Sequence, residues 1–359
     1  MLEINTQVIV YIVLAFAISC AVSYFISPLV MKFANLVGAV DVPKDERRMH
    51  KKPLTRLGGL SIFLGFMAAV FIFNDISLQV AGILIGSVII VVLGILDDIY
   101  RLKAWMKLIV QIIAALIPVF CDVVIRIFSN PLYIFGIGGP YLDLGIWAYP
   151  ITVIWIIVIT NSVNLIDGLD GLAVGVSSIA SISMLIIAVV LPTPHVALLM
   201  AALAGGCMGF MPYNRNPAKM FMGDTGALFL GYILATTSIM GLFKLYAIIS
   251  FAVPFLVLGL PIFDTVSAVL RRLSKGKSPM SPDRSHVHHK LIDMGFSHKQ
   301  SVAILYLMSA VLGITAVVLT TAGEIKAIIL LASVLFASAI AIGLVIVGRR
   351  NGGDSGDEQ

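Results

Sequence analysis

Long apolar runs dominate the chain, and its polar residues are confined to short intervals between these runs. The uncharged stretches 7–31, 78–96 and 172–191 reach the roughly 20 residues that a helix needs to cross the hydrocarbon core of a bilayer. A helix also satisfies its own backbone hydrogen bonds, which lipid cannot do. The pattern therefore predicts an all-α, polytopic membrane protein.

The apolar runs divide into ten or eleven spans where charged or turn-forming residues interrupt them. Their approximate bounds are 8–31, 57–74, 78–96, 104–121, 146–162, 172–191, 196–212, 225–243, 245–270, 301–321 and 325–348. We expect one transmembrane domain over residues 1–348, because no interval is long enough for a separate soluble domain. The segment 349–359 is polar and glycine-rich and is expected to be disordered.

Composition and charge add an orientation. The chain is 59% hydrophobic and 12% charged, whereas a soluble domain is about 45–50% apolar and about 25% charged. Of the 24 Lys and Arg residues, 21 fall on one side of the predicted spans, the exceptions being Arg126, Lys244 and Lys326. Basic loops mark the cytoplasmic side, so the N-terminus is expected outside and the C-terminus in the cytoplasm. On the outer side, Gly138-Gly139-Pro140 within the interval 122–145 favours a small surface hairpin.

Four polar clusters fall on the predicted cytoplasmic side. They are Asp97-Asp98, the series from Asn161 to Asp170, the pair Asn214 and Asp224, and the run His286-Val287-His288-His289. Hydropathy and basic residues alone set the topology, so the gathering of these clusters on one side is a separate indication of a site there.

The two adjacent acids end a long apolar run. A charge at mid-bilayer costs about 2.5–3.5 kcal/mol, so Asp97 and Asp98 are expected at the interface or in a wet cavity. A structural charge pair at a helix end, balanced by Arg101 and Lys103, is the alternative. Acids at a helix C-terminus interact unfavourably with the helix dipole, however, which argues against a purely structural role. We therefore predict a functional role for this pair.

The second cluster places a polar residue at every third position. Its members are Asn161, Asn164, Asp167 and Asp170. Gly168 and Gly171 permit local unwinding, which would direct these side chains at one ligand. Carboxylate and amide oxygens suit Mg²⁺, or Mn²⁺ in its place, together with substrate phosphates and water. A polar turn between two spans is the alternative.

Asp224 and the histidine run suggest contacts with an anion. Asp224 begins an apolar span, where a helix N-terminus favours anions, although an N-cap explains an aspartate there equally well. The histidine run and Arg284 offer donors for phosphates, His as imidazolium or as a neutral N–H donor. Zinc is a weaker alternative because no cysteine accompanies the histidines, and basic residues on this side also follow from topology alone.

Acids for a metal, donors for phosphates and a membrane interface together indicate phosphoryl transfer onto or from a lipid. At these positions the chain resembles the polyprenyl-phosphate N-acetylhexosamine-1-phosphate transferases, the glycosyltransferase 4 family that includes MraY, WecA and TagO. The matching strings are LDD at 96–98, NSVNLIDGLDGLA at 161–173, NPAKMFMGDTGAL at 216–228 and DRSHVHH at 283–289. The resemblance runs from about residue 24 to 348.

The resemblance implies transfer of a sugar-1-phosphate from a UDP-sugar to a polyprenyl phosphate, with release of UMP. It implies that Asp97 is the base for the lipid phosphate, with Asp98 in support, and that Mg²⁺ lies near Asn164, Asp167 and Asp224. The residues implied around the uridine are Lys51, Asp170, Asn214 and Phe221. Those implied around the sugar phosphate are Arg284, His286, His288 and His289.

The histidine run favours one branch of the family. MraY-like enzymes carry three consecutive histidines followed by Phe-Glu, whereas this chain has Val287 between His286 and His288 and continues with Lys290-Leu291. This form resembles the WecA and TagO branch, which uses UDP-GlcNAc. We therefore expect UDP-GlcNAc and undecaprenyl phosphate as substrates, in the first membrane step of a teichoic acid or O-antigen type of pathway. A phospho-MurNAc-pentapeptide transferase of peptidoglycan synthesis is the alternative.

Two other classes of protein fit less well. A transporter of a nucleotide-sugar or an anion would carry its polar groups near mid-membrane on repeated, broken helices, whereas these acids gather at one edge. A CDP-alcohol phosphatidyltransferase would need an Ala-Arg pair, but Ala173 is followed by Val174.

The expected location is the cytoplasmic membrane, with the active site facing the cytoplasm. The bilayer is an expected partner, nucleic acid is not, and a homodimer stays open.

Overall fold

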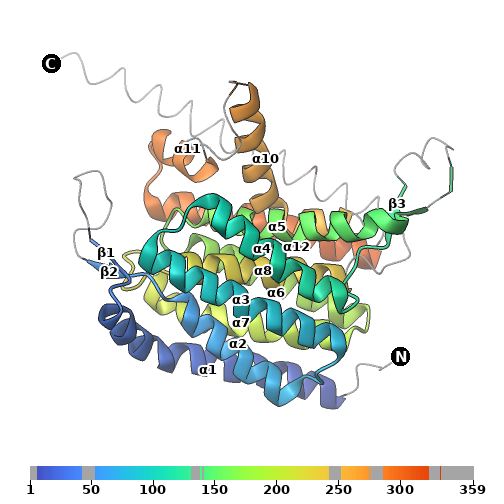
Figure 1. Cartoon of the computed structure of the whole chain (residues 1–359), viewed down its shortest axis with the longest axis horizontal. Helices are drawn as coiled ribbons and strands as arrows, with labels where there is room; N and C mark the ends of the chain where they lie inside the picture. The colour runs from blue at the N-terminus through green and yellow to red at the C-terminus, as the bar shows by residue number, and fades with distance from the viewer. Residues whose placement is uncertain are drawn as a thin grey trace.

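The computed structural model describes residues 6–42, 53–130, 138–139, 141–241, 252–274, 276, 286–322 and 332. Its helices run side by side as a bundle, with loops at the two ends (Figure 1). The helices of the first half are α1 Thr6–Leu36, α2 Gly59–Phe73, α3 Leu78–Tyr100, α4 Ala104–Phe120 and α5 Ala148–Ile166. Those of the second half are α6 Leu172–Val190, α7 Pro194–Asn214, α8 Gly223–Gly241, α9 Ala252–Val257, α10 Gly259–Ser274, α11 Val287–Asp293 and α12 His298–Ala322.

The predicted all-α, polytopic membrane fold is confirmed. Within the described residues, six helices are long and apolar enough to cross a membrane, and these are α1, α3, α5, α6, α7 and α12. The helices α2 and α4 are shorter but also apolar. The expected spans from 8–31 to 225–243 each coincide with one helix, and the span 301–321 coincides with α12. The expected span 325–348 and the tail 349–359 fall outside the part of the chain that the structure describes.

The helix expected over 245–270 is not continuous, and here the prediction was wrong. The structure has α9 and α10, separated by a turn at Leu258, and α10 projects away from the bundle (Figure 1). Pro261 explains the break, because proline has no N–H to donate to the Val257 carbonyl four residues earlier. Gly259 beside it further lowers the cost of leaving the helical conformation.

The helix α8 lies at the centre of the bundle. Every residue after Asp224 in this helix is buried, and α8 packs on α3 and α5. Glycines permit the close approach, because an added Cβ on Gly94 of α3 would collide with Thr225 and one on Gly59 of α2 would collide with Gly226. These contacts fix the first turn of α8, and with it Asp224.

Two short antiparallel strand pairs lie at opposite ends of the bundle (Figure 1). At one end β1 Val40–Asp41 pairs with β2 Leu54–Thr55. At the other end β3 Ile127–Ser129 pairs with β4 Tyr141–Asp143, and the short helix η2 Gly145–Trp147 follows. The second pair confirms the hairpin predicted in the interval 122–145.

Candidate active site

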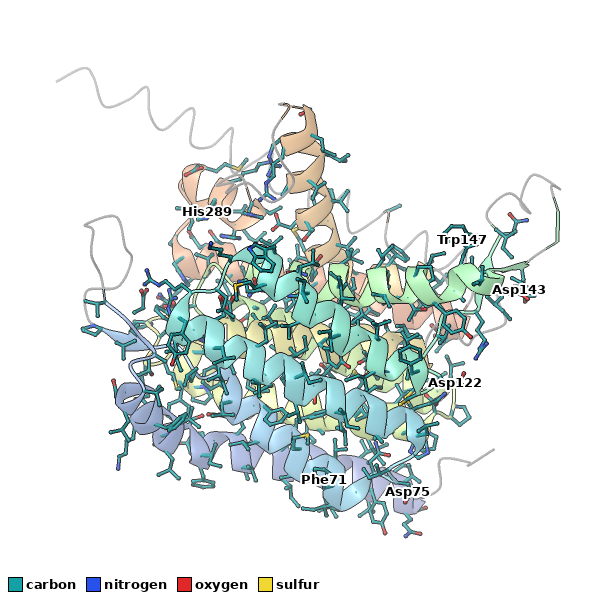
Figure 2. All side chains as sticks on the ribbon, viewed as in Figure 1. Phe71, Asp75, Asp122, Asp143, Trp147 and His289 are labelled. Carbon is teal, nitrogen blue, oxygen red and sulfur yellow. The ribbon has the colours of Figure 1, made fainter. Side chains whose placement is uncertain are left out.

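The predicted site residues gather at the end of the bundle that carries β1 and β2. The helices α3, α5 and α7 end there and α8 begins there, so Asp98 contacts Asp224 although 126 residues separate them. In Figure 2 the labelled His289 lies toward this end, whereas Asp75, Asp122, Asp143 and Trp147 lie at the opposite end. One end of the molecule therefore holds the chemistry that the sequence distributes over distant segments.

A cavity of about 670 Å³ opens at this end. The predicted catalytic, metal or nucleotide residues that line it are Asp98, Asn164, Asp167, Asp170, Asn214, Phe221 and Asp224. Every predicted metal or nucleotide residue that the structure describes is therefore part of this wall. Lys51 and Arg284, which were also predicted, lie outside the described residues.

Asp98 fixes the first turn of α8. Its carboxylate accepts hydrogen bonds from the backbone N–H groups of Asp224 and Thr225, both at 3.0 Å, and from the Thr225 hydroxyl at 2.7 Å. Backbone N–H groups in the first turn of a helix have no partner within the helix, so an acceptor from a neighbouring helix satisfies them. The cap that was considered for Asp224 is thus provided by Asp98, and the Asp224 carboxylate has other partners.

Asp97 and Asp224 share one ammonium group. The Lys107 Nζ lies 2.9 Å from Asp97 Oδ2 and 2.9 Å from Asp224 Oδ2. Asp97 also accepts a hydrogen bond from the Leu102 N–H at 2.7 Å, where the chain passes from α3 to α4. Two carboxylates this close repel each other, and the shared ammonium offsets that repulsion. Asp97 therefore stands beside Asp224, next to the described lining of the cavity.

The turn after α5 carries Asp167. This residue leaves the helical conformation (φ −76°, ψ 49°), and Gly171 takes a positive φ of 79° before α6 begins. The unwinding predicted from Gly168 and Gly171 is therefore present. Burial, and then the negative charges of Asp224 and Asp98, raise the pKa of Asp167 from its ordinary 3.8 to about 8. The carboxyl group thus keeps its proton at neutral pH until a cation compensates its charge.

Hydrogen bonds join this turn to the segment between α7 and α8. Asp170 Oδ2 accepts a hydrogen bond from the Asn216 side-chain amide at 3.0 Å. Asn214 accepts one from the Gly171 N–H at 3.1 Å and donates one to the Met220 carbonyl at 3.0 Å. Asp170 and Asn214, two of the residues predicted near the uridine, therefore also hold the wall of the cavity in shape.

The histidine run lies behind this wall. His286 Nδ1 is 2.8 Å from Asp264 Oδ2 of α10, and His288 packs on Gly168, where an added Cβ would collide with the imidazole. Burial, and then the neighbouring His289, lower the pKa of His288 from 6.5 to about 4. His288 is therefore neutral at pH 7, which leaves N–H donation as its way to contact a phosphate. None of the three histidines is among the described residues that line the cavity.

The oxygen donors of Asn164, Asp167 and Asp224 have the chemistry that Mg²⁺ prefers. All three side chains face one cavity, and the Asn164 amide interacts with the Asp224 carboxylate. Mg²⁺ takes one or two carboxylates and retains waters and substrate phosphates. In the described part of the chain, no three His, Cys, Asp or Glu side chains form a complete metal site. The donor set therefore fits an ion that shares its coordination with a phosphorylated substrate.

Four residues of this region were missed in the sequence. Lys107, which bridges Asp97 and Asp224, was counted only among the basic residues of the cytoplasmic side. Arg56 and His298 line the cavity, but neither of them was assigned a role from the sequence. Asp264, the partner of His286, was absorbed into the span 245–270. Lys107 and Asp264 did carry a signal, because Lys107 is the one charged residue of α4 and Asp264 is the one charged residue of the apolar run 245–270. Ionisable residues in apolar segments of a membrane protein mark functional sites.

Comparison with known proteins places the chain in a family. Residues 80–242 match the model of glycosyl transferase family 4. A Bacillus subtilis protein, named as a probable undecaprenyl-phosphate N-acetylglucosaminyl 1-phosphate transferase, is 41% identical over 87% of this chain and 86% of its own length. A decaprenyl-phosphate N-acetylglucosaminephosphotransferase of Mycobacterium leprae is 34% identical over 80% of this chain and 78% of its own length. A phospho-N-acetylmuramoyl-pentapeptide-transferase of Caldicellulosiruptor bescii is 31% identical over 86% of this chain and 95% of its own length. Because the matched segment runs from α3 to α8 and the similarity to relatives covers most of both chains, this protein belongs to glycosyl transferase family 4.

Proposed function

We propose that this protein transfers N-acetylglucosamine-1-phosphate from UDP-N-acetylglucosamine to undecaprenyl phosphate, with release of UMP. The observation that carries the proposal is a cavity at one end of a transmembrane bundle, where carboxylates from α3, the turn after α5 and α8 converge. Such a pocket can receive a water-soluble nucleotide sugar from the aqueous side and a lipid phosphate from the bilayer. The product would be the first lipid-linked intermediate of a surface polysaccharide.

The names of the relatives support these two substrates. Two relatives named for N-acetylglucosamine phosphate transfer to undecaprenyl or decaprenyl phosphate are 41% and 34% identical over 87% and 80% of this chain, whereas two muramoyl-pentapeptide relatives are 31% and 34% identical over 86% and 63% of it. The interrupted histidine run, with Val287 between His286 and His288, favours the same branch. Transfer of phospho-MurNAc-pentapeptide is therefore the second candidate.

In the proposed reaction, an oxygen of the lipid phosphate attacks the β-phosphorus of the nucleotide sugar. The new phosphorus–oxygen bond forms as the bond from the β-phosphorus to the bridging oxygen breaks, and that oxygen leaves with UMP. A phosphate monoester has a second pKa of about 6, so most of it is ionised at pH 7 and needs little help from a base. Asp97 accepts the proton of a lipid phosphate that arrives protonated.

The protein's own residues supply positioning and charge. Asp98 holds the first turn of α8. Lys107 offsets the repulsion between the carboxylates of Asp97 and Asp224. Asn164, Asp167 and Asp224 would hold Mg²⁺, or Mn²⁺ in its place. When bound, this ion neutralises the diphosphate and stabilises the leaving phosphate.

We assign the cavity to the cytoplasmic face of the cell membrane, with the N-terminus on the outer side. The support is the distribution of charge, since 21 of the 24 Lys and Arg residues fall in intervals predicted to lie on the same side as Asp98, Asp167 and Asp224. Arg126 is one of the three exceptions, and it lies beside β3 at the other end of the bundle.

The test is turnover by the purified, full-length protein. With Mg²⁺, undecaprenyl phosphate and UDP-GlcNAc labelled in the sugar, it should form labelled lipid and an equal amount of UMP. Preference for UDP-MurNAc-pentapeptide in the same assay would favour the second candidate. Asp224→Ala should abolish turnover, whereas Asp143→Ala, at the opposite end of the bundle (Figure 2), should not. Exchange of label between UMP and UDP-GlcNAc without any lipid would contradict the single-step reaction.

A further inference from the structure

The cavity is lined by acids far more than by bases. Among its described lining residues five are aspartates, and Arg56 is the one lysine or arginine. A nucleotide diphosphate brings negative charge of its own into this acidic pocket, so its binding needs compensating cations. An arginine on the wall is suited to this, because its planar guanidinium matches two phosphate oxygens at once.

The backbone of Arg56 is held beside the first turn of α8. Its N–H donates to the Ala39 carbonyl at 3.0 Å, and the Phe221 N–H donates to the neighbouring Thr55 carbonyl at 2.8 Å. Gly223, which precedes Asp224, takes a positive φ of 74°, and an added Cβ there would collide with the Arg56 carbonyl. Arg56 is therefore fixed by the same framework that carries Phe221 and starts α8.

The side chain of Arg56 is held more loosely than its backbone. Its Nη2 lies 3.4 Å from Asp41 Oδ2, beyond the roughly 2.7–2.9 Å of a good charge-assisted hydrogen bond. The Asp41 side chain is 6% exposed, whereas that of Arg56 is 32% exposed. The five N–H donors of a guanidinium exceed what one carboxylate at this distance can accept. The charge of Arg56 also acts on Asp167 within the same cavity.

We propose that Arg56 binds the diphosphate of the nucleotide sugar, and that its contact with Asp41 is the resting position from which the guanidinium reaches this ligand. The inference rests on the proposed function, because it takes a nucleotide diphosphate as the occupant of the cavity. Asp41 is then the buried partner with which the guanidinium pairs when no ligand is bound. In this assignment Arg56 contacts the phosphates and makes no contact with the uracil.

The experiment compares the binding of UDP and of uridine to the purified, full-length protein by titration calorimetry. Arg56→Ala should raise the Kd of UDP by roughly 10- to 150-fold, the range of one hydrogen bond to a charged group. The Kd of uridine should stay unchanged, because uridine carries no phosphate. Arg56→Lys should recover part of the UDP affinity, since it keeps the charge but not the fork. Arg126→Ala is the matched control, because Arg126 also pairs with an aspartate, Asp122, but lies at the opposite end of the bundle.

The outcomes distinguish a failure of the Arg56 assignment from a failure of the proposed function. If Arg56→Ala weakens UDP and uridine equally, Arg56 only supports the shape of the cavity and the inference is wrong. Asp41→Asn should leave the Kd of UDP no higher than in the wild type, and an increase as large as that of Arg56→Ala would also overturn the inference. A wild-type protein that binds UDP but forms no lipid-linked sugar would contradict the proposed function alone. Unchanged UDP binding by Arg56→Ala in an active enzyme would contradict the arginine assignment alone.

Discussion

Replacing Asp98 by asparagine tests how the protein positions Asp224. In the wild-type protein one oxygen of Asp98 accepts the Asp224 N–H, and the other accepts the N–H and the hydroxyl of Thr225. Asparagine has nearly the same shape but presents an NH₂ group in place of one oxygen, so at least one of these donors meets another donor. At roughly 1.5–3 kcal/mol for a hydrogen bond to a charged acceptor, the first turn of α8 loses at least that amount.

The expected result is a fall in kcat with little change in the KM for UDP-GlcNAc. If the full cost is expressed in the transition state, roughly 1.5–3 kcal/mol corresponds to a loss of about 10- to 150-fold. A positioning role predicts the same factor at every pH, whereas loss of a catalytic base would change the shape of the pH–rate profile. Thr225→Val, which removes the hydroxyl donor and keeps the shape, should fall between the wild type and Asp98→Asn. Wild-type kcat and thermal stability in Asp98→Asn would refute the argument.

Three further outcomes follow from the site. Lys107→Gln should lower kcat by roughly 10²-fold or more, the cost of losing one preorganised electrostatic group, and Lys107→Arg should recover part of it; unchanged turnover of the Gln variant would contradict this. Gly168→Ala should displace His288 and lower turnover, whereas Gly139→Ala, where an added Cβ meets nothing within 4 Å, should change neither turnover nor thermal stability. In EDTA the folded protein holds a proton on Asp167 that the unfolded chain releases, so the free energy of unfolding should fall as the pH rises from 3.8 to about 8. Thermal unfolding of Asp167→Asn should show a shallower fall with pH than the wild type. A fall as steep as that of the wild type would show that Asp167 does not contribute to it.

The transmembrane architecture was predictable because lipid leaves a chain few choices. A span must be a helix of a certain length, and alternation of loops then brings Asp98, Asp167 and Asp224 to one end of the bundle. The break in the helix expected over 245–270 was also readable, since Pro261 removes a donor. The segment 245–270 was predicted as one continuous helix because its overall hydropathy is high, and its two prolines were not taken into account.

The partners of each side chain were not predictable from single segments. That Asp98 caps α8 depends on how α3 is rotated against α8. That rotation is set by the contact of Gly94 with Thr225, between residues far apart in the chain. The bridging position of Lys107 depends in the same way on how α4 packs. Hydropathy places a residue along the membrane normal, but helix packing decides which residue it meets.

In the proposed reaction the sugar and its phosphate are transferred together to the lipid phosphate within one cavity. UDP-GlcNAc carrying ³²P in the β-phosphate and ³H in the sugar tests this most directly with the purified protein and undecaprenyl phosphate. Both labels should enter the lipid product in the ratio that they have in the substrate, and unlabelled UMP should be released. Lipid that contains ³H without ³²P, with the phosphate left in UDP, would contradict the proposed reaction.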